Sequence, residues 1–287
     1  ANIGIVNYLG SAYTFQAADN PGWIHNGGKV YTTLGNALPP GGSASIELVL
    51  RVVHSDPQAL INRAEVYSMK DVNGGVLKDF DSTPDDEVSN DAGGLVYSFA
   101  DDWLGGDGTT DEDDADPATV SVFDLALILT TDQQLPVKGE QDVLFHLTVC
   151  NQGTVAAHDI GVVYYMPSGL SLSPLDANAW FTMGGLLRNQ LAGALHPDDC
   201  RIQDVLLRVQ PSALPNALLS VAEISHAKDA SGTDMSSHDW DSKSDLDPSN
   251  DAGGVVGSVY DNAMTGDGIL DEDDADPAQL QMLDLAL

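Results

Sequence analysis

The chain repeats itself, and this repeat constrains its fold more than any other feature of the sequence. The motif Ser-Asn-Asp-Ala-Gly-Gly at 89–94 returns at 249–254, and the acidic run at 106–118 returns at 266–278. Both recurrences have an offset of 160 residues. A fixed period of this size indicates one folding unit present more than once. A length of 287 residues fits roughly two domains at about 150 residues each.

The two copies begin at different points of the repeat. Residues 128–157 have no counterpart in the first copy, and the chain closes at 283–287 with a near copy of 123–127. The repeat therefore predicts a domain at 1–122 that lacks its first strands and a complete domain at 123–282. Residues 283–287 are then the first strand of a following repeat or a donor strand.

Three explanations account for the shorter first copy. The chain is a stretch of a longer tandem-repeat protein, or residues 283–287 complete the first domain of a neighbouring copy by β-augmentation. Alternatively, the first domain is simply smaller. The first two explanations make further repeats, or copies of the chain itself, its expected protein partners.

Alternating apolar residues predict β-strands. The period-two pattern is clear in the runs at 46–52 and 143–149, and turn-rich clusters of Gly, Pro, Asn and Asp separate such runs. Long helical periodicity is absent from the sequence. We therefore expect an all-β fold of two antiparallel β-sandwiches in tandem.

Acidic residues are concentrated in two segments, 79–116 and 239–276, which we expect to be connectors. Together they hold 26 of the 44 acidic residues, with Lys243 as their one basic residue. Two carboxylates about 4 Å apart repel by roughly 4 kcal/mol at an effective dielectric constant near 20. The net charge of −33 also argues against nucleic acid or an anionic membrane as partner. Cations are the expected partner.

Calcium suits these segments because Ca²⁺ accepts six to eight oxygen ligands from carboxylates, amides, backbone carbonyls and water. Side chains two and four positions apart in 107–113 and 267–273 are expected to converge on an ion, without the full EF-hand pattern. The predicted ligands are Asp81, Asp85, Asn90, Asp91, Asp107, Thr109, Asp111, Asp113, Asp114 and Asp116 in the first segment, and Asp241, Asp245, Asn250, Asp251, Asp267, Ile269, Asp271, Asp273, Asp274 and Asp276 in the second.

Two other interpretations of the acidic segments remain open. They could be solvated, disordered linkers, which is the usual meaning of a charge run, although apolar islands at 93–97 and 253–257 favour a defined backbone. Acid pairs for glycoside cleavage would require a carboxyl of raised pKa in a cleft with an aromatic floor. Dense, duplicated acids favour ion ligands instead, and the sequence contains no nucleophile elbow, phosphate loop or dinucleotide motif. An enzyme is not expected.

Several strand motifs resemble a known family. The segments 123–127, 136–140, 143–153 and 165–170 are similar to the conserved-repeat, Ig-like domain of large bacterial surface and secreted proteins of the Bacteroidetes type. The acidic stretches resemble linkers between such repeats and, over a few residues, thrombospondin-type calcium repeats. The resemblance implies Ig-like β-sandwiches in an extracellular stalk, adhesin or fibre.

The two cysteines, Cys150 and Cys200, lie at the ends of predicted strands on outward-facing positions. If these strands are neighbours, a disulfide between them would close a loop of about 50 residues and contribute roughly 3 to 4 kcal/mol. An oxidising compartment would favour the bond. The sequence leaves open whether it forms.

The expected function is structural: a segment of an extracellular or cell-surface stalk, fibre or filament, stiffened by Ca²⁺ in its acidic connectors. The alternative is an adhesin module that recognises carbohydrate or a partner protein through exposed loops. That alternative predicts a solvent-facing aromatic cluster, and aromatic residues make up 6% of the chain. No run of about 18 apolar residues appears, so a membrane span is not expected.

Overall fold

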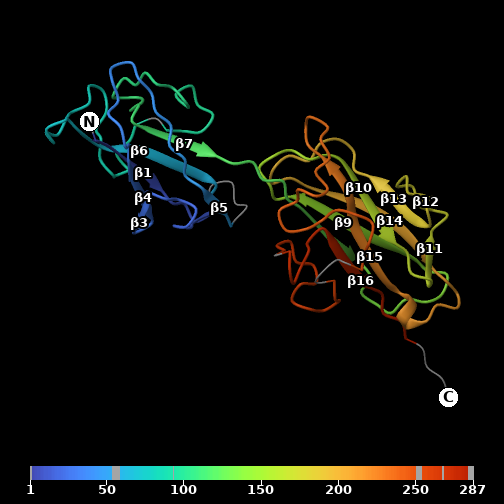
Figure 1. Cartoon of the computed structure of the whole chain (residues 1–287). Helices are drawn as coiled ribbons and strands as arrows, with labels where there is room; N and C mark the ends of the chain where they lie inside the picture. The colour runs from blue at the N-terminus through green and yellow to red at the C-terminus, as the bar shows by residue number, and fades with distance from the viewer. Residues whose placement is uncertain (1, 54–58, 93, 250–253, 267, 284–287) are drawn as a thin grey trace. The chain divides into compact units, whose positions relative to one another are not determined.

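The computed structural model describes residues 2–53, 59–92, 94–249, 254–266 and 268–283. The chain divides into two compact units, Ala1–Val120 and Ser121–Leu287, here called unit 1 and unit 2 (Figure 1). Regular structure in the described residues consists of β-strands and one 3-10 turn, Pro215–Ala217. The predicted all-β fold class is confirmed.

Unit 2 is a sandwich of two antiparallel sheets (Figure 1). The first sheet has the order β12-β13-β10-β15-β16, and the second has the order β11-β14-β9-β8. The strands are β8 (Leu125–Thr131), β9 (Asp142–Asn151), β10 (His158–Tyr165), β11 (Leu170–Leu172), β12 (Phe181–Met183), β13 (Leu186–Gln190), β14 (Cys200–Val209), β15 (Leu219–Lys228) and β16 (Ala275–Gln279).

The core of unit 2 follows from the period-two pattern of its strands. Alternate side chains of β9 and β14, such as Phe145 and Leu207, are fully buried between the sheets. Tyr164 of β10 packs edge-on against Phe145, and Trp180 packs against Tyr164 in the same way. Burial of each large apolar side chain contributes roughly 1.5 to 3 kcal/mol. This packed core fixes the strands that carry the site described below.

Unit 1 has one sheet with the same strand order as the first sheet of unit 2, namely β3-β4-β1-β6-β7. Its second sheet contains only β2 and β5. The strands are β1 (Asn2–Tyr8), β2 (Tyr13–Phe15), β3 (Ile24–Asn26), β4 (Lys29–Thr33), β5 (Leu50–Val52), β6 (Ile61–Lys70) and β7 (Ala115–Thr119). Among the described residues of unit 1, no strand corresponds to β8 or β9.

The alternation at 46–52 predicts a longer strand than unit 1 forms. Only Leu50–Val52 is a strand there, whereas its counterpart in unit 2, Cys200–Val209, extends over ten residues. The longer strand pairs with β9 along one edge, from Cys200 to Arg208. The shorter strand pairs with β2 alone, so most of its alternating run has no neighbour to bond.

Two further sequence features have defined places. Cys150 and Cys200 are opposite each other in the β9–β14 pair and are joined by a disulfide. The position of Cys200 is held by Ser43 in the repeat of unit 1, so the bond belongs to unit 2 alone. Among the described residues, no helix is long and apolar enough to cross a membrane.

Candidate cation site

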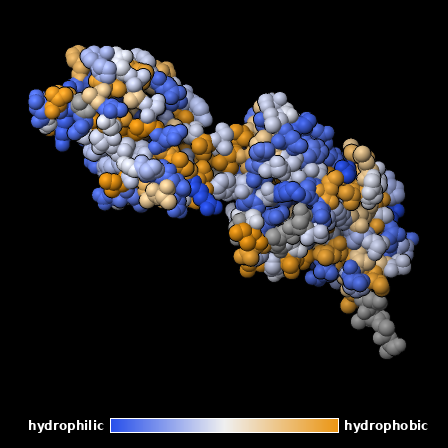
Figure 2. Space-filling view, viewed as in Figure 1, coloured by the Kyte–Doolittle hydropathy of each residue, from blue (hydrophilic) through white to orange (hydrophobic). Residues whose placement is uncertain are grey.

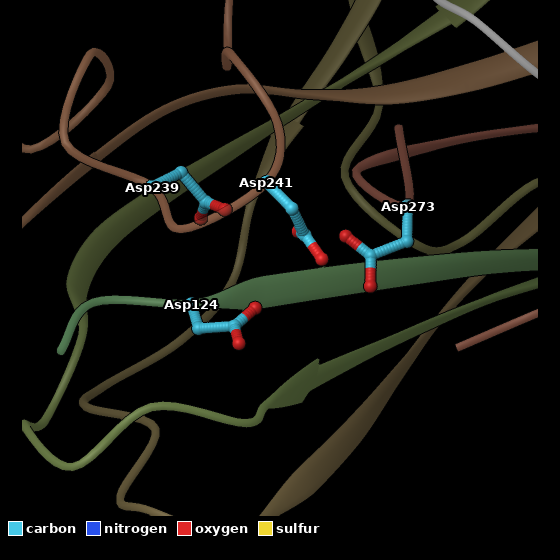
Figure 3. Close-up of side chains that lie close together, drawn as sticks. All are labelled: Asp124, Asp239, Asp241 and Asp273. Carbon is cyan, nitrogen blue, oxygen red and sulfur yellow. The ribbon is translucent and has the colours of Figure 1, made fainter. Parts of the chain in front are cut away.

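Four aspartates of unit 2 come together from three separate parts of the chain. Asp124 precedes β8, Asp239 and Asp241 follow β15, and Asp273 precedes β16. Each offers a carboxylate oxygen, and these oxygens all lie within 4.8 Å of one another. Figure 3 shows the four carboxylates directed into one shared space. Asp124 is 1% exposed and Asp273 is 2% exposed, so the cluster lies largely inside the unit.

Asp124 is held by its own backbone. Its carbonyl oxygen accepts hydrogen bonds from the amides of Gln152 and Gly153, at 2.9 and 3.2 Å, where β9 ends. Position 153 must be glycine, because a Cβ there would lie 2.5 Å from the carbonyl oxygen of Val122. The entering chain can therefore lie close to the end of β9, which places the Asp124 side chain at the cluster.

Asp239 is fixed against the start of β8. Its Oδ2 accepts a hydrogen bond from the Leu125 amide at 2.9 Å, and its Oδ1 accepts one from the Ser242 hydroxyl at 2.9 Å. Asp239 also forms an isolated parallel bridge with Phe123. The acidic segment 239–276 is thus joined to the first strand of its own unit by backbone and side-chain bonds.

Asp273 brings a buried acceptor oxygen to the cluster. Its Oδ2 accepts a hydrogen bond from the Gly266 amide at 3.1 Å, and its backbone oxygen accepts one from the Leu127 amide at 2.6 Å. Its buried Oδ1 has no hydrogen-bond partner among the described residues. This oxygen belongs to a carboxylate directed toward Asp124 and Asp241 (Figure 3). A buried acceptor without a partner is costly, because it loses its water and gains nothing in return.

The electrostatics of the cluster favour a bound positive charge. Burial, together with the neighbouring charge of Asp124, raises the pKa of Asp239 from 3.8 to about 7. Burial also raises the pKa of Asp273, and Asp241 and Asp124 add to that effect. Such carboxyls are neutralised either by protons or by a cation. The donor set consists entirely of oxygen, which matches the ligand preference of hard divalent cations such as Ca²⁺.

The structure brings two of the predicted unit 2 ligands, Asp241 and Asp273, into this cluster. Asp276 is buried, and its carboxylate accepts the amides of Leu129 and Asn262 at 2.8 and 3.1 Å, so it anchors the segment to β8. Asp245 bonds to the ammonium of Lys243 at 2.8 Å. Asp271 and Asp274 are buried, and the Ile269 side chain is exposed, whereas Asn250, Asp251 and Asp267 lie outside the described residues.

The predicted convergence in 107–113 takes a different form. Asp107 accepts hydrogen bonds from the amides of Thr109 and Thr110, at 2.9 and 2.7 Å, and these bonds lower its pKa. Its carboxylate thus closes a local turn. Asp111 is 3% exposed, and burial raises its pKa. Among the described residues, Asp107, Asp111 and Asp113 form no group with three carboxylate oxygens within 4.8 Å.

Other predicted ligands of unit 1 lie around a buried glutamate. Burial and the charges of Glu112 and Asp85 raise the pKa of Asp91 to about 6. Burial and the charges of Glu65, Glu112 and Asp91 raise the pKa of Asp114 to about 7. Glu65 is 2% exposed and accepts hydrogen bonds from the Tyr8 hydroxyl and the Asp85 amide. These acids are mutually close, but Glu65 is already bonded through both oxygens.

The remaining predicted ligands of unit 1 lie in separate surroundings. Asn90 donates to the Asp85 carboxylate at 2.9 Å, which satisfies that group locally. Asp116 lies within 4.8 Å of Asp101 and Asp102 in a more exposed group. Asp81, the counterpart of Asp241, belongs to neither carboxylate group found among the described residues.

Sequence reasoning did not include Asp124 and Asp239 among the candidate ligands. Asp124 lies in the motif Phe-Asp-Leu-Ala-Leu, where a single polar residue interrupts an apolar strand, and that interruption was the available signal. Asp239 begins the second acidic segment. Both residues lie far from Asp273 along the chain, so a pattern of closely spaced ligands could not link either of them to it.

Comparisons with known proteins add little to this geometry. No family model and no curated protein sequence matches the chain. Among solved structures, the major pilin subunit BcpA of Bacillus cereus, as a D312A variant, is 8% identical with a TM-score of 0.30. That alignment covers 82% of this chain and 61% of the pilin. An inactive D437A mutant of a GH20 exo-β-N-acetylglucosaminidase from Vibrio harveyi is 13% identical, with a TM-score of 0.22, and the alignment covers 36% of this chain and 16% of that enzyme.

Proposed function

We propose that the chain is a structural segment of an extracellular stalk, fibre or filament, and that Ca²⁺ bound in the acidic part of its repeat stiffens it. One observation carries this proposal: the buried cluster of Asp124, Asp239, Asp241 and Asp273, in which Asp273 Oδ1 has no hydrogen-bond partner among the described residues. A cation there would neutralise the cluster and join β8 to the acidic segment.

The position of the cluster supports a stiffening role. Asp124 lies at the entry of unit 2, four residues after the boundary at Val120, and Asp273 precedes the last strand of the unit. An ion between them would fasten the entering and leaving parts of the chain to each other. Metal ligation adds directly to folding stability because the unfolded chain holds no such site.

Two further features support the proposed setting. The Cys150–Cys200 disulfide suits an oxidising, extracellular compartment. Regular structure in the described residues of both units is almost entirely β-strand, which suits a structural module.

Calcium titration of the whole chain tests the proposal. We expect Ca²⁺ to bind and to raise the melting temperature of unit 2, with Mg²⁺ much less effective because it demands regular octahedral geometry. The matched variants are Asp241→Asn and its counterpart in the repeat, Asp81→Asn. Asp241→Asn should weaken the calcium site at least about tenfold, equivalent to about 1.4 kcal/mol. Asp81→Asn should leave that site within about twofold of the unmodified chain.

Two results would refute this proposal. The first is a calorimetric titration without calcium binding, together with a melting temperature that does not respond to Ca²⁺. The second is equal weakening by Asp241→Asn and Asp81→Asn, since a general charge effect would act on both.

A second candidate function has a specific observation in its favour. Unit 1 exposes aromatic side chains in one segment: Tyr97 is 84% exposed, Phe99 is 82% exposed, and Phe99 lies 6.4 Å from Trp103 between ring centroids. The counterparts of Tyr97 and Phe99 in unit 2 are Gly257 and Val259, and Val259 is also exposed. The exposure is therefore a property of the segment in both units, and the aromatic residues are specific to unit 1.

Exposed aromatic rings of this kind suit an adhesin that stacks on sugar rings or packs against a partner protein. A glycan array with the whole chain tests this function, with Phe99→Ala as the variant and Val259→Ala as the matched control. Binding that is lost only with Phe99→Ala would favour the adhesin. Absence of any glycan signal would count against carbohydrate binding and would favour the structural function.

A further inference from the structure

Unit 1 has an open apolar face where unit 2 has a closed core. A cavity of about 280 Å³ lies on this face, and its lining includes Asn7, Leu48, Leu50, Val52, Asn62 and Ala118. Figure 2 shows apolar residues reaching the surface of unit 1. The corresponding side of the first sheet of unit 2 packs into the sandwich core of that unit.

The corresponding face of unit 2 shows what covers such a surface. There β8 and β9 complete the second sheet, and the counterpart residues are at most 8% exposed, namely Val205, Leu207, Val209 and Ala278. In unit 1, by contrast, Leu48, Leu50 and Val52 are only half-buried and Ala118 is exposed. The difference between the units is thus the presence or absence of two strands.

Polar groups on the same face also lack partners. Asn7 is 3% exposed, and neither its Oδ1 nor that of Asn62 has a hydrogen-bond partner among the described residues. Both side chains line the cavity. The repeat places Tyr164 at the position of Asn7, where it packs against Phe145 of β9. On this face of unit 1, two amide oxygens therefore lack hydrogen-bond partners among the described residues, and the apolar side chains are incompletely buried.

The backbone partners of β8 have counterparts in unit 1. In unit 2, the amides of Leu125, Leu127 and Leu129 donate to Asp239, to the backbone oxygen of Asp273 and to Asp276. The repeat carries aspartate at all three equivalent positions of unit 1, namely Asp79, Asp113 and Asp116. The three aspartates that accept the β8 amides in unit 2 therefore recur in unit 1.

We infer that the open face of unit 1 is a docking face for an antiparallel strand pair with the sequence pattern of β8 and β9. The strand that lies beside β7 carries an aspartate at the position of Asp124. This aspartate joins Asp79, Asp81 and Asp113, the counterparts of the other three cluster residues, and a cation site forms when the strands dock. The cation part rests on the proposed function, and the docking of the strands does not.

A peptide tests the inference with the chain as it exists. It carries the sequence of residues 121–156 with Cys150→Ser, so that it cannot exchange disulfides with the protein, and a scrambled peptide of equal composition is the reference. Binding to the whole chain is measured by fluorescence anisotropy in Ca²⁺ and in EDTA. Amide hydrogen exchange then locates the bound peptide, with protection expected in 48–52 and 115–119.

Two protein variants make the test specific. Ala118→Arg adds a bulky charge at a position that is exposed in unit 1, so the unit should fold normally while the docking face is blocked. Val49→Arg is the matched control, because Val49 is 54% exposed and alternates with Leu48 and Leu50, which places it on the opposite side of the run. We expect Ala118→Arg to weaken peptide binding at least about tenfold and Val49→Arg to change it by less than about twofold.

The measurements test the docking of the strands and the shared cation site separately. Docking is overturned by binding no tighter than the scrambled peptide, by protection confined to unit 2, or by equal binding to the Ala118→Arg protein. A peptide with Asp124→Asn should bind equally in Ca²⁺ and EDTA, and calcium enhancement that persists in this peptide overturns the shared cation site. Failure of the proposed function would appear independently, as absence of calcium binding to unit 2 without any peptide.

Discussion

Asp124→Asn should change the stability of unit 2 in opposite directions with and without calcium. The substitution is nearly isosteric and removes one negative charge from a cluster whose oxygens lie within 4.8 Å of one another. At that distance, and with an effective dielectric constant near 20, each fully charged pair repels by about 3 kcal/mol. Partial protonation reduces this value, because the pKa of Asp239 is about 7.

In EDTA the variant should therefore be more stable than the unmodified chain, by about 2 kcal/mol. For a unit of this size, that corresponds to a melting temperature higher by roughly 4 to 8 °C. In calcium at a hundred times its dissociation constant, the unmodified chain gains about 2.7 kcal/mol. A hundredfold weaker site in the variant would gain only about 0.4 kcal/mol at the same calcium concentration.

Differential scanning calorimetry in EDTA and in Ca²⁺ measures both effects. The matched control is Asp132→Asn, because Asp132 follows the other end of β8 and its side chain is 84% exposed. The control should respond to calcium like the unmodified chain. The reasoning is wrong if Asp124→Asn lowers the melting temperature in EDTA, or if its calcium response equals that of the control.

Three other predictions follow from the same structure. Burial raises the pKa of Asp239 and Asp276 to about 7, so the folded chain binds more protons than the unfolded chain between about pH 4 and 7. The melting temperature in EDTA should therefore fall as the pH rises from 5 to 7.5, and saturating Ca²⁺ should remove most of this decline; an EDTA melting temperature that rises with pH would contradict the assignment. Reduction of the Cys150–Cys200 disulfide, which closes a separation of 50 residues, should cost unit 2 about 4 kcal/mol while leaving the melting of unit 1 unchanged. Limited proteolysis in EDTA should cut within 239–276 faster than in Ca²⁺, as read by mass spectrometry of the fragments, and equal rates would argue against an ion holding that segment.

The alternation of apolar residues determined the strands wherever a neighbouring strand was available. The run at 143–149 lies within β9, as its period-two pattern predicted. The run at 46–52 carries the same kind of pattern, yet only its last three residues form β5. A strand needs a partner for its amides and carbonyls, and local sequence does not say whether one is present.

The acidic composition similarly identified the segments that hold the site but not the residues that meet. Asp241 and Asp273 were predicted as ligands, and the structure groups them with Asp124 and Asp239. The expected local convergence in 107–113 is replaced by a turn in which Asp107 accepts the amides of Thr109 and Thr110. A nearby amide satisfies an aspartate at a smaller cost in chain entropy than a distant partner does, so short spacings alone do not predict where carboxylates gather.

The sequence by itself determined that the chain is all-β, that its repeat has a period of 160 residues, and that most of its acidic residues, 26 of 44, lie in two segments. Only the tertiary structure decided which carboxylates share a space. Asp124 and Asp273 are separated by most of unit 2 along the chain and come together because β8 lies between β9 and the start of β16. Contacts of that separation depend on the packing of whole sheets, which the spacing of residues in a single segment does not encode.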